Sequence, residues 1–314
     1  MKIAFMYAGQ GSQAVGMGKD FYETYPEFRE VLDNTNVGFD VKDCCFNGPA
    51  EMLNTTKYTQ PCMVAFAVGV TKVLKNKGIV PEMAAGLSLG EYSALYCAGV
   101  FDEQQVVSLV AFRGQSMAEA VVDRECGMKA VINLERDKVI SCCKQAEEEF
   151  KDSEFGVCEP TNFNCPGQIV ISGDKAPVER AAELMMEAGA RRCLPLNVSG
   201  PFHTSLMKPA GDKLKERFTN ENFGAMKVPV VFNTLGRTKN EDETIPALLE
   251  KQVQHSIYVE DSIRFMAEQG VDTIVEIGPG STLSKFVQKT CPEIKCYSVE
   301  KIADVDTLVE ALGK

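Results

Sequence analysis

A single serine lies between two glycines in the stretch GLSLGEYSAL, which runs from Gly86 to Leu95. The G-x-S-x-G spacing, after a short apolar segment and before a helical pattern, is typical of a nucleophile elbow, a sharp strand-to-helix turn that lifts a serine hydroxyl. The backbone N–H of Leu89, the next residue, would then face a developing oxyanion. Glycine-flanked serines are also common in ordinary turns, so the pattern alone leaves both interpretations of Ser88 open.

A serine hydroxyl becomes a good nucleophile when a base takes its proton, and the chain has only two histidines. His203 lies in VSGPFHTSLM, on a predicted loop between a strand that ends near 198 and a helix that starts near 205. His255 lies in KQVQHSIYV, between two helical patterns. Each is a candidate base, and each is equally compatible with an ordinary loop histidine. No carboxylate stands out as a third member, but a backbone or amide carbonyl can also orient an imidazole.

An arginine interrupts the apolar stripe of the helix predicted over 102–125. Val106, Val110, Arg113 and Met117 follow helical spacing, so Arg113 takes a position where leucine is expected. A buried guanidinium needs an anion or a set of acceptors, and its planar fork suits a carboxylate. The alternatives are an internal salt bridge or a side chain whose charged end reaches solvent.

Composition narrows the class of protein. The 314 residues are 45% hydrophobic, which is enough for a large core and a second, smaller domain. A net charge of −11, without basic runs, argues against nonspecific nucleic-acid binding. The longest apolar run, 63–70, is far shorter than the ~20 residues of a membrane span, and no signal-peptide core is recognisable. We therefore expect a cytoplasmic chain without membrane contact, with reduced cysteines and no metal site, because no zinc-ligand spacing occurs.

Alternating strand and helix patterns predict an α/β fold with a hydrolase-like parallel sheet flanked by helices. The strands are expected near 3–7, 83–87, 228–233, 271–277 and 295–299, and helices near 18–34, 60–76 and 102–125. The middle of the chain differs, with strands at 127–133, 156–161, 168–172 and 192–196 and helices at 136–150 and 175–189. That order, β-α-β-β-α-β, is the ferredoxin-like unit. We expect a small ferredoxin-like domain, 126–197, inserted into a large α/β acyltransferase domain made of 1–125 and 198–314.

Eight motifs then occur in order along nearly the whole chain. They are GQGSQ (9–13), GPAEMLNTT (48–56), TQP (59–61), GLSLGE (86–91), RGQSM (113–117), NFNCPGQIVISG (162–173), VSGPFHTSLMKPA (198–210) and VEIGPG (275–280). Together they resemble the malonyl-CoA:acyl carrier protein transacylases of fatty acid synthesis and, more broadly, the acyltransferase domains of polyketide synthases. Any one of these motifs is weak evidence, but eight in order are highly specific.

The resemblance implies a catalytic role for several residues. Ser88 resembles the acylated nucleophile and His203 the general base, while Gln252 resembles the residue whose carbonyl orients that imidazole. The backbone N–H of Gln10, in GQGSQ, resembles the second oxyanion donor beside that of Leu89.

Other residues resemble substrate contacts of the family. Arg113 resembles the clamp on the free carboxylate of the malonyl group, and Asn162 a polar residue near the mouth of the cleft. Phe202, a bulky residue before the histidine, resembles the malonyl-selective pattern, since a ring there would crowd an α-methyl group. We expect malonyl to be preferred over methylmalonyl by the ~1–3 kcal/mol that one methyl group allows.

Two segments depart from the family pattern. Leu87 stands where members usually have histidine. If it ends a strand it points away from the site, and we expect the change to affect packing or local polarity more than chemistry. Residues 256–259 read Ser-Ile-Tyr-Val in place of Pro-Val-x-Trp. His255 is then a candidate substitute contact.

The resemblance implies a ping-pong transfer of malonyl from malonyl-CoA to the phosphopantetheine thiol of acyl carrier protein, without a metal or other cofactor. We expect a monomer, and candidate cations for docking an acidic carrier are Lys208, Lys213, Lys215, Arg191 and Arg192. The alternatives are an acyltransferase serving a polyketide synthase, a serine thioesterase and a noncatalytic carrier-binding module. A thioesterase predicts a carboxylate partner for the histidine, and a noncatalytic module would survive the loss of Ser88 and His203.

Overall fold

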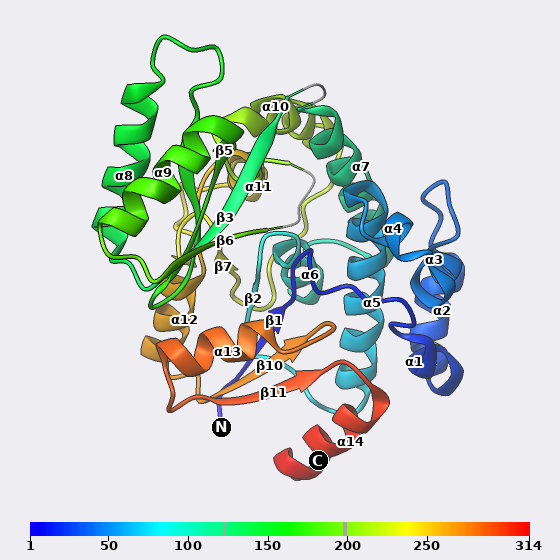
Figure 1. Cartoon of the computed structure of the whole chain (residues 1–314). Coiled ribbons are helices and arrows are strands. Elements are labelled where there is room, and N and C mark those ends of the chain that lie inside the picture. The colour runs from blue at the N-terminus through cyan, green and yellow to red at the C-terminus, as the bar shows by residue number, and fades with distance from the viewer. Residues whose placement is uncertain (122–123, 197–199) are drawn as a thin grey trace.

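A four-stranded parallel sheet lies at the centre of the molecule (Figure 1). The computed structural model describes residues 1–121, 124–196 and 200–314. The strand order is β11 (Lys295–Val299), β10 (Thr273–Ile277), β1 (Ile3–Tyr7), β2 (Met83–Gly86), with every neighbouring pair parallel. The predicted strand over 228–233 is reduced to β7 (Val231–Phe232), which a parallel bridge between Ala84 and Val230 sets beside β2. The predicted α/β fold with a parallel sheet flanked by helices is confirmed.

Both faces of this sheet are covered, which explains why β1 reads as an uninterrupted apolar run. Successive side chains of a strand point to opposite faces. Phe5 and Tyr7 enter the core formed with α5 (Thr56–Asn76), α6 (Gly90–Cys97) and α7 (Glu103–Glu119). Ala4 and Met6 enter the core formed with α12 (Val259–Glu268) and α13 (Thr282–Thr290). A parallel strand buried on both faces has no polar side to alternate with.

The remaining elements frame this layered part. They are α1 (Lys19–Thr24), α2 (Pro26–Asn34), α3 (Val41–Asn47), α4 (Ala50–Leu53), the 3₁₀ helix Ser205–Met207, α10 (Lys208–Phe218), β8 (Arg237–Thr238), α11 (Ile245–Gln254), β9 (Ile257–Tyr258) and α14 (Ile302–Leu312). The helix predicted over 18–34 is two helices, because Tyr25 is extended before Pro26, as residues before proline tend to be. The helix predicted over 102–125 ends at Glu119. Within the described ranges, no helix combines the length and apolarity needed to cross a bilayer.

A second sheet occupies the middle third of the sequence, the green part of Figure 1. Its elements are β3 (Cys126–Ile132), α8 (Arg136–Glu149), β4 (Cys158–Cys165), β5 (Gln168–Asp174), α9 (Lys175–Glu187) and β6 (Arg192–Pro195), in the predicted order. The strands lie side by side as β6-β3-β5-β4-β9, antiparallel except for the β4–β9 pair. β4 is longer than predicted and includes Asn162. The predicted boundary between 197 and 198 lies outside the described residues.

The strand β9 joins the two sheets. It belongs to the C-terminal part of the chain but pairs with β4, so that Asn162 lies opposite Ile257 and Phe163 opposite Tyr258. The rings of Phe163 and Tyr258 stack with centroids 5.2 Å apart. Arg136 of α8 lies 4.3 Å from the Phe163 centroid and pairs with Asp261 of α12 at 2.6 Å. The segment that departs from the family pattern, 256–259, therefore builds the junction that holds the strand of Asn162.

Candidate active site

The nucleophile elbow forms where β2 ends and α6 begins. Ser88 has φ of 52°, in the left-handed region that is costly for a residue with a side chain. The two flanking glycines allow close approaches that a Cβ would block. A Cβ on Gly86 would lie 2.0 Å from the carbonyl carbon of Gly90, and one on Gly90 would lie 2.2 Å from the carbonyl oxygen of Tyr7. The two glycines are therefore required by backbone packing, of Gly86 against Gly90 and of Gly90 against the end of β1.

His203 meets Ser88 across the sequence. Its Nε2 lies 2.8 Å from Ser88 Oγ, although the two residues are 115 positions apart. Its Nδ1 lies 2.7 Å from the backbone carbonyl oxygen of Gln252. A carbonyl can only accept, so Nδ1 carries the proton and donates it, which leaves Nε2 free to take the serine proton. The imidazole is thereby oriented without a carboxylate.

The environment of His203 keeps it neutral. Only 3% of the residue is exposed, and burial lowers the pKa of its imidazole to about 4, with the positive charge of Arg113 as the second cause. A neutral imidazole is the form that accepts a proton. His255 is exposed at the end of α11, with Nδ1 3.1 Å from the carbonyl of Lys251. The side chain of His255 thus bonds the end of its own helix, and its role as a substitute contact stays a prediction.

Arg113 lies beside the nucleophile and is 1% exposed. It donates to Gln60 Oε1 at 2.9 Å, to Gln252 Oε1 at 3.0 Å and to Ser88 Oγ at 3.2 Å. Its guanidinium carbon lies 5.5 Å from the centre of the Tyr92 ring. These three acceptors are neutral, and the side chain does not reach solvent. Among residues 1–121, 124–196 and 200–314 it forms no salt bridge, so neither alternative from the sequence holds there. Burial lowers the pKa of Arg113, while the nearby Tyr92 and Glu91 act against that shift.

Leu89 and Gln10 lie where two oxyanion donors are needed. Both line the same pocket as Ser88. Neither backbone N–H has a hydrogen-bond partner in the part of the chain that the structure describes. The loop of Gln10 is fixed by its side chain, whose Nε2 donates to Thr56 Oγ1 at 3.0 Å. Their role as an oxyanion hole stays a prediction.

The pocket has a volume of about 400 Å³ and lies between the two sheets. Two loops contribute to its walls, residues 8–12 and 87–89. The other lining residues are Gln60 of α5, Arg113 and Met117 of α7, Met128, Asn162, Asn164, Val170 and Leu196 of the middle segment, Phe202 and His203, and Thr282, Leu283 and Phe286. Asn162 and Asn164 each have a buried Oδ1 without a hydrogen-bond partner among the described residues. Phe202 is 8% exposed. Two amides and an aromatic ring are thus available to a ligand beside the nucleophile.

One prediction about the pocket is wrong. Leu87 was expected to point away from the site, but it lines the pocket. The reason is that β2 ends at Gly86, so Leu87 already belongs to the turn and does not follow the alternation of the strand.

Three polar residues of the site were not predicted from the sequence. Gln60 lies in the long buried helix α5 and accepts from Arg113. Asn233 follows β7, and its side-chain oxygen accepts from the backbone N–H of Ser88 in the elbow. Glu91 is buried and accepts from the backbone N–H of Asn233. The sequence held a signal for each of the three, namely a polar residue within or directly after an apolar stretch. Asn233 also follows a strand, at the carboxyl-end edge of a parallel sheet where ligands commonly bind.

Comparisons with known proteins agree with this geometry. Residues 4–309 match the family described as acyl transferase domain. The chain is 39% identical over 315 residues to the malonyl CoA-acyl carrier protein transacylase of Haemophilus influenzae, covering 99% of each protein. It is similar in structure to the MCAT of Streptococcus pneumoniae, with a TM-score of 0.93, 42% identity and coverage of 99% and 100%. It is also similar to a malonyl-transacylase in complex with its type II PKS acyl-carrier protein, with a TM-score of 0.93, 37% identity and the same coverage.

The low pKa of His203 predicts an unusually acidic pH profile. Attack by Ser88 needs the neutral imidazole, so the acylation rate should rise with pH through about 4 and be flat above about 5.5. An ordinary histidine would give a midpoint near 6.5. We expect this profile for acylation by p-nitrophenyl acetate, with circular dichroism at each pH to verify that the protein is folded. A midpoint at 6 or above in folded protein would contradict the buried, cation-facing imidazole.

Proposed function

The chain belongs to the malonyl CoA-acyl carrier protein transacylase family, and from that premise we propose that it moves the malonyl group of malonyl-CoA to the phosphopantetheine thiol of an acyl carrier protein. The observation that carries this proposal is the buried guanidinium of Arg113, held by neutral acceptors 3.2 Å from the nucleophile. A serine and histidine alone would serve any ester or thioester. No acidic side chain lines this pocket among the residues that the structure describes, and a cation in such a pocket favours a substrate that brings its own carboxylate.

The first half-reaction acylates the serine. His203 Nε2 takes the proton of Ser88 Oγ as the oxygen attacks the thioester carbonyl of malonyl-CoA. The backbone N–H groups of Leu89 and Gln10 stabilise the negative charge that develops on the carbonyl oxygen. The carbon–sulfur bond then breaks, coenzyme A leaves with the proton that His203 returns to its sulfur, and a malonyl ester remains on Ser88.

The second half-reaction repeats these steps with a different nucleophile. The phosphopantetheine thiol of the carrier loses its proton to His203 and attacks the malonyl ester. The oxygen of Ser88 leaves and is reprotonated by His203, so the enzyme returns to its starting state. Transfer is faster than hydrolysis of the malonyl ester when water cannot reach a position from which it attacks that ester. The pocket between the two sheets, with a volume of about 400 Å³, supports this exclusion of water.

Selectivity for malonyl follows from two residues. The carboxylate of the malonyl group binds Arg113 in place of the amide oxygens of Gln60 and Gln252, which are weaker acceptors for a guanidinium. Phe202 fills the pocket wall next to His203 and limits substituents at the α-carbon. Asn162 contributes an unpartnered amide oxygen near the mouth for a polar part of the substrate.

The architecture proposed for this chemistry has two domains. Residues 1–125 and 198–314 form a hydrolase-like α/β acyltransferase domain, and 126–197 form an inserted ferredoxin-like domain. The strand order β6-β3-β5-β4 and the packing of α8 against α9 support the second assignment. The pocket then lies between the domains, where ligand sites are common.

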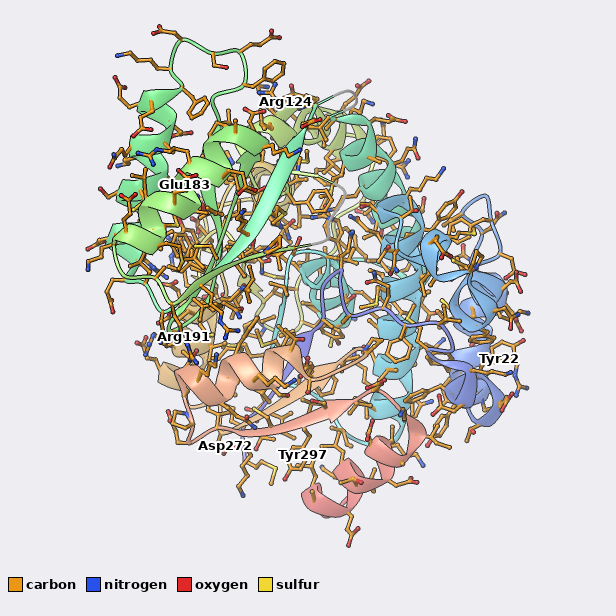
Figure 2. All side chains as sticks on the ribbon, in the orientation of Figure 1. Tyr22, Arg124, Glu183, Arg191, Asp272 and Tyr297 are labelled. Atoms are coloured by element: carbon orange, nitrogen blue, oxygen red, sulfur yellow. The ribbon has the colours of Figure 1, made fainter. Side chains whose placement is uncertain are left out.

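Carrier docking needs cations that are free to meet acidic groups. Lys208 and Lys215 pair with Asp212 at 2.7 Å and Glu250 at 3.7 Å, and Lys213 pairs with Glu119. These pairs reduce the positive charge that a carrier would meet there. Arg124 and Arg191 lie at opposite ends of the second sheet (Figure 2), and Arg191 and Arg192 are exposed.

A cytoplasmic monomer is proposed for this reaction, in either fatty acid or polyketide assembly.

A serine thioesterase is the less favoured alternative. It would be expected to orient its histidine with a carboxylate, whereas Nδ1 of His203 bonds a backbone carbonyl. It would also have no use for a buried cation facing the nucleophile.

Substituting the nucleophile and the clamp tests the function directly. Ser88→Ala should abolish transfer of radiolabel from malonyl-CoA to holo-acyl carrier protein. Arg113→Ala should lower kcat/KM for malonyl-CoA by on the order of 100-fold, about 3 kcal/mol, because a buried charge pair is lost, while acetyl transfer is retained or improved. Lys151→Ala, which removes an exposed ion pair with Glu148, is the control. An unchanged ratio of malonyl to acetyl transfer in Arg113→Ala would refute the clamp.

The ring of Phe202 gives a separate prediction on the α-carbon. Phe202→Ser should raise kcat/KM for methylmalonyl-CoA relative to malonyl-CoA by roughly 5- to 100-fold, since one methyl group in an apolar pocket changes binding by about 1–3 kcal/mol. Competition between the two thioesters in one reaction gives the ratio. Equal ratios in the wild type and the variant would remove Phe202 from the selectivity account.

A further inference from the structure

The turn that carries the nucleophile is held by the side chain of a residue distant in sequence. Asn233 Oδ1 accepts from the backbone N–H of Ser88 at 2.6 Å, and its Nδ2 donates to the carbonyl of Gly86, also at 2.6 Å. One amide therefore bonds two successive peptide groups at the point where β2 ends. Ser88 would otherwise keep its strained left-handed φ with a partly buried N–H unpaired.

Asn233 is itself fixed from two sides. Its backbone N–H donates to Glu91 Oε2 at 2.6 Å, and its carbonyl accepts from the N–H of Tyr258 at 2.8 Å. The residue is 2% exposed and directly follows β7, which lies beside β2. Burial raises the pKa of Glu91 to about 8, so this carboxyl is mainly neutral at pH 7 and supports Asn233 as a hydrogen-bond acceptor. Asn233 therefore has little freedom to move.

A second amide holds the other side of the serine. Gln252 Nε2 donates to the carbonyl oxygen of Ser88 at 2.8 Å. In a trans peptide the C=O of one residue and the N–H of the next point in opposite directions. Fixing the carbonyl of Ser88 toward Gln252 therefore turns the N–H of Leu89 away from Gln252. Leu89 lines the pocket and its N–H has no partner among the described residues, so an N–H held in this direction is available as an oxyanion donor.

We propose that Asn233 is a positioning residue for serine acylation: together with the side chain of Gln252 it clamps the peptide groups on both sides of Ser88 and so aims the Leu89 N–H at the oxyanion. This inference deepens the proposed function and rests on it. Gln252 then acts in three ways: its backbone carbonyl orients His203, its Nε2 holds the elbow, and its Oε1 holds Arg113.

A purely structural role for Asn233 makes a different prediction. Loss of a buried hydrogen-bonded amide lowers stability in any protein, but the fraction that is folded would then keep its rate per active site. A positioning role lowers kcat in fully folded protein and leaves KM for malonyl-CoA nearly unchanged, because the oxyanion contact is made only in the transition state. The split between kcat and KM therefore separates the two roles.

The test compares Asn233→Ala and Asn233→Asp with wild type and with Ser172→Ala. Ser172 is a matched control, because it is fully buried, its hydroxyl donates to the Gly127 carbonyl at 2.9 Å, and neither residue lines the pocket. Rates are measured for malonyl transfer and for acylation by p-nitrophenyl acetate, which has no carboxylate and does not need Arg113. Folding is checked by circular dichroism and thermal unfolding.

Asn233→Ala should lower kcat and the acylation rate roughly 10- to 100-fold with KM within about 3-fold of wild type. Asn233→Asp keeps an acceptor for the Ser88 N–H and should recover part of the rate, and Ser172→Ala should keep both rates. Rates within 2-fold of wild type in folded Asn233→Ala, or no recovery in Asn233→Asp, would overturn the inference.

If Asn233→Ala does not fold, Gln252→Ala tests the other half of the clamp. It keeps the backbone carbonyl that orients His203, so an unchanged acylation rate with p-nitrophenyl acetate would overturn the inference, and a drop of at least 5-fold would support it. A different result would contradict the proposed function: wild-type protein that is acylated by p-nitrophenyl acetate but does not transfer malonyl from malonyl-CoA to the carrier.

Discussion

The positive charge of Arg113 is buried beside the nucleophile and is held by neutral acceptors. Burying a cation without a counterion is costly, so the surrounding elements must supply fixed dipoles to hold it. Gln60 of α5 and Gln252 of α11 do this, and the ring of Tyr92 adds its face. Burial lowers the pKa of His203 and the charge of Arg113 lowers it further, so Arg113 also favours the neutral imidazole that can accept a proton.

The sheet brings these groups together because its parallel strands end at one edge. β1 leads into the loop of Gln10, β2 into Ser88, and the strand beside β2 into Asn233. The nucleophile turn is therefore supported from three neighbouring strand ends, and α6 begins directly after it. Residues of the second sheet line the opposite side of the pocket, and β9 pairs with β4 of that sheet.

Residues with a local signature could be predicted, and residues defined by distant contacts could not. Ser88 is marked by its glycines and Arg113 by its place on an apolar stripe, because both signals lie within a few residues. The choice of His203 over His255 needed the family resemblance, since the sequence around each is compatible with a loop. Asn233 contacts Ser88 across 145 positions through its side chain, and no short pattern encodes that pairing. The orientation of Leu87 was mispredicted because the last residue of β2 was placed one position too late.

The claim that Arg113 is a receptor for the substrate carboxylate is tested most directly by a crystal structure of the Ser88→Ala protein with malonyl-CoA bound. The account predicts that the malonyl carboxylate accepts two hydrogen bonds from the Arg113 guanidinium, at about 2.7–3.0 Å, and that the amide oxygens of Gln60 and Gln252 yield at least one of theirs. A carboxylate directed to solvent, with both amide contacts of Arg113 intact, would contradict it.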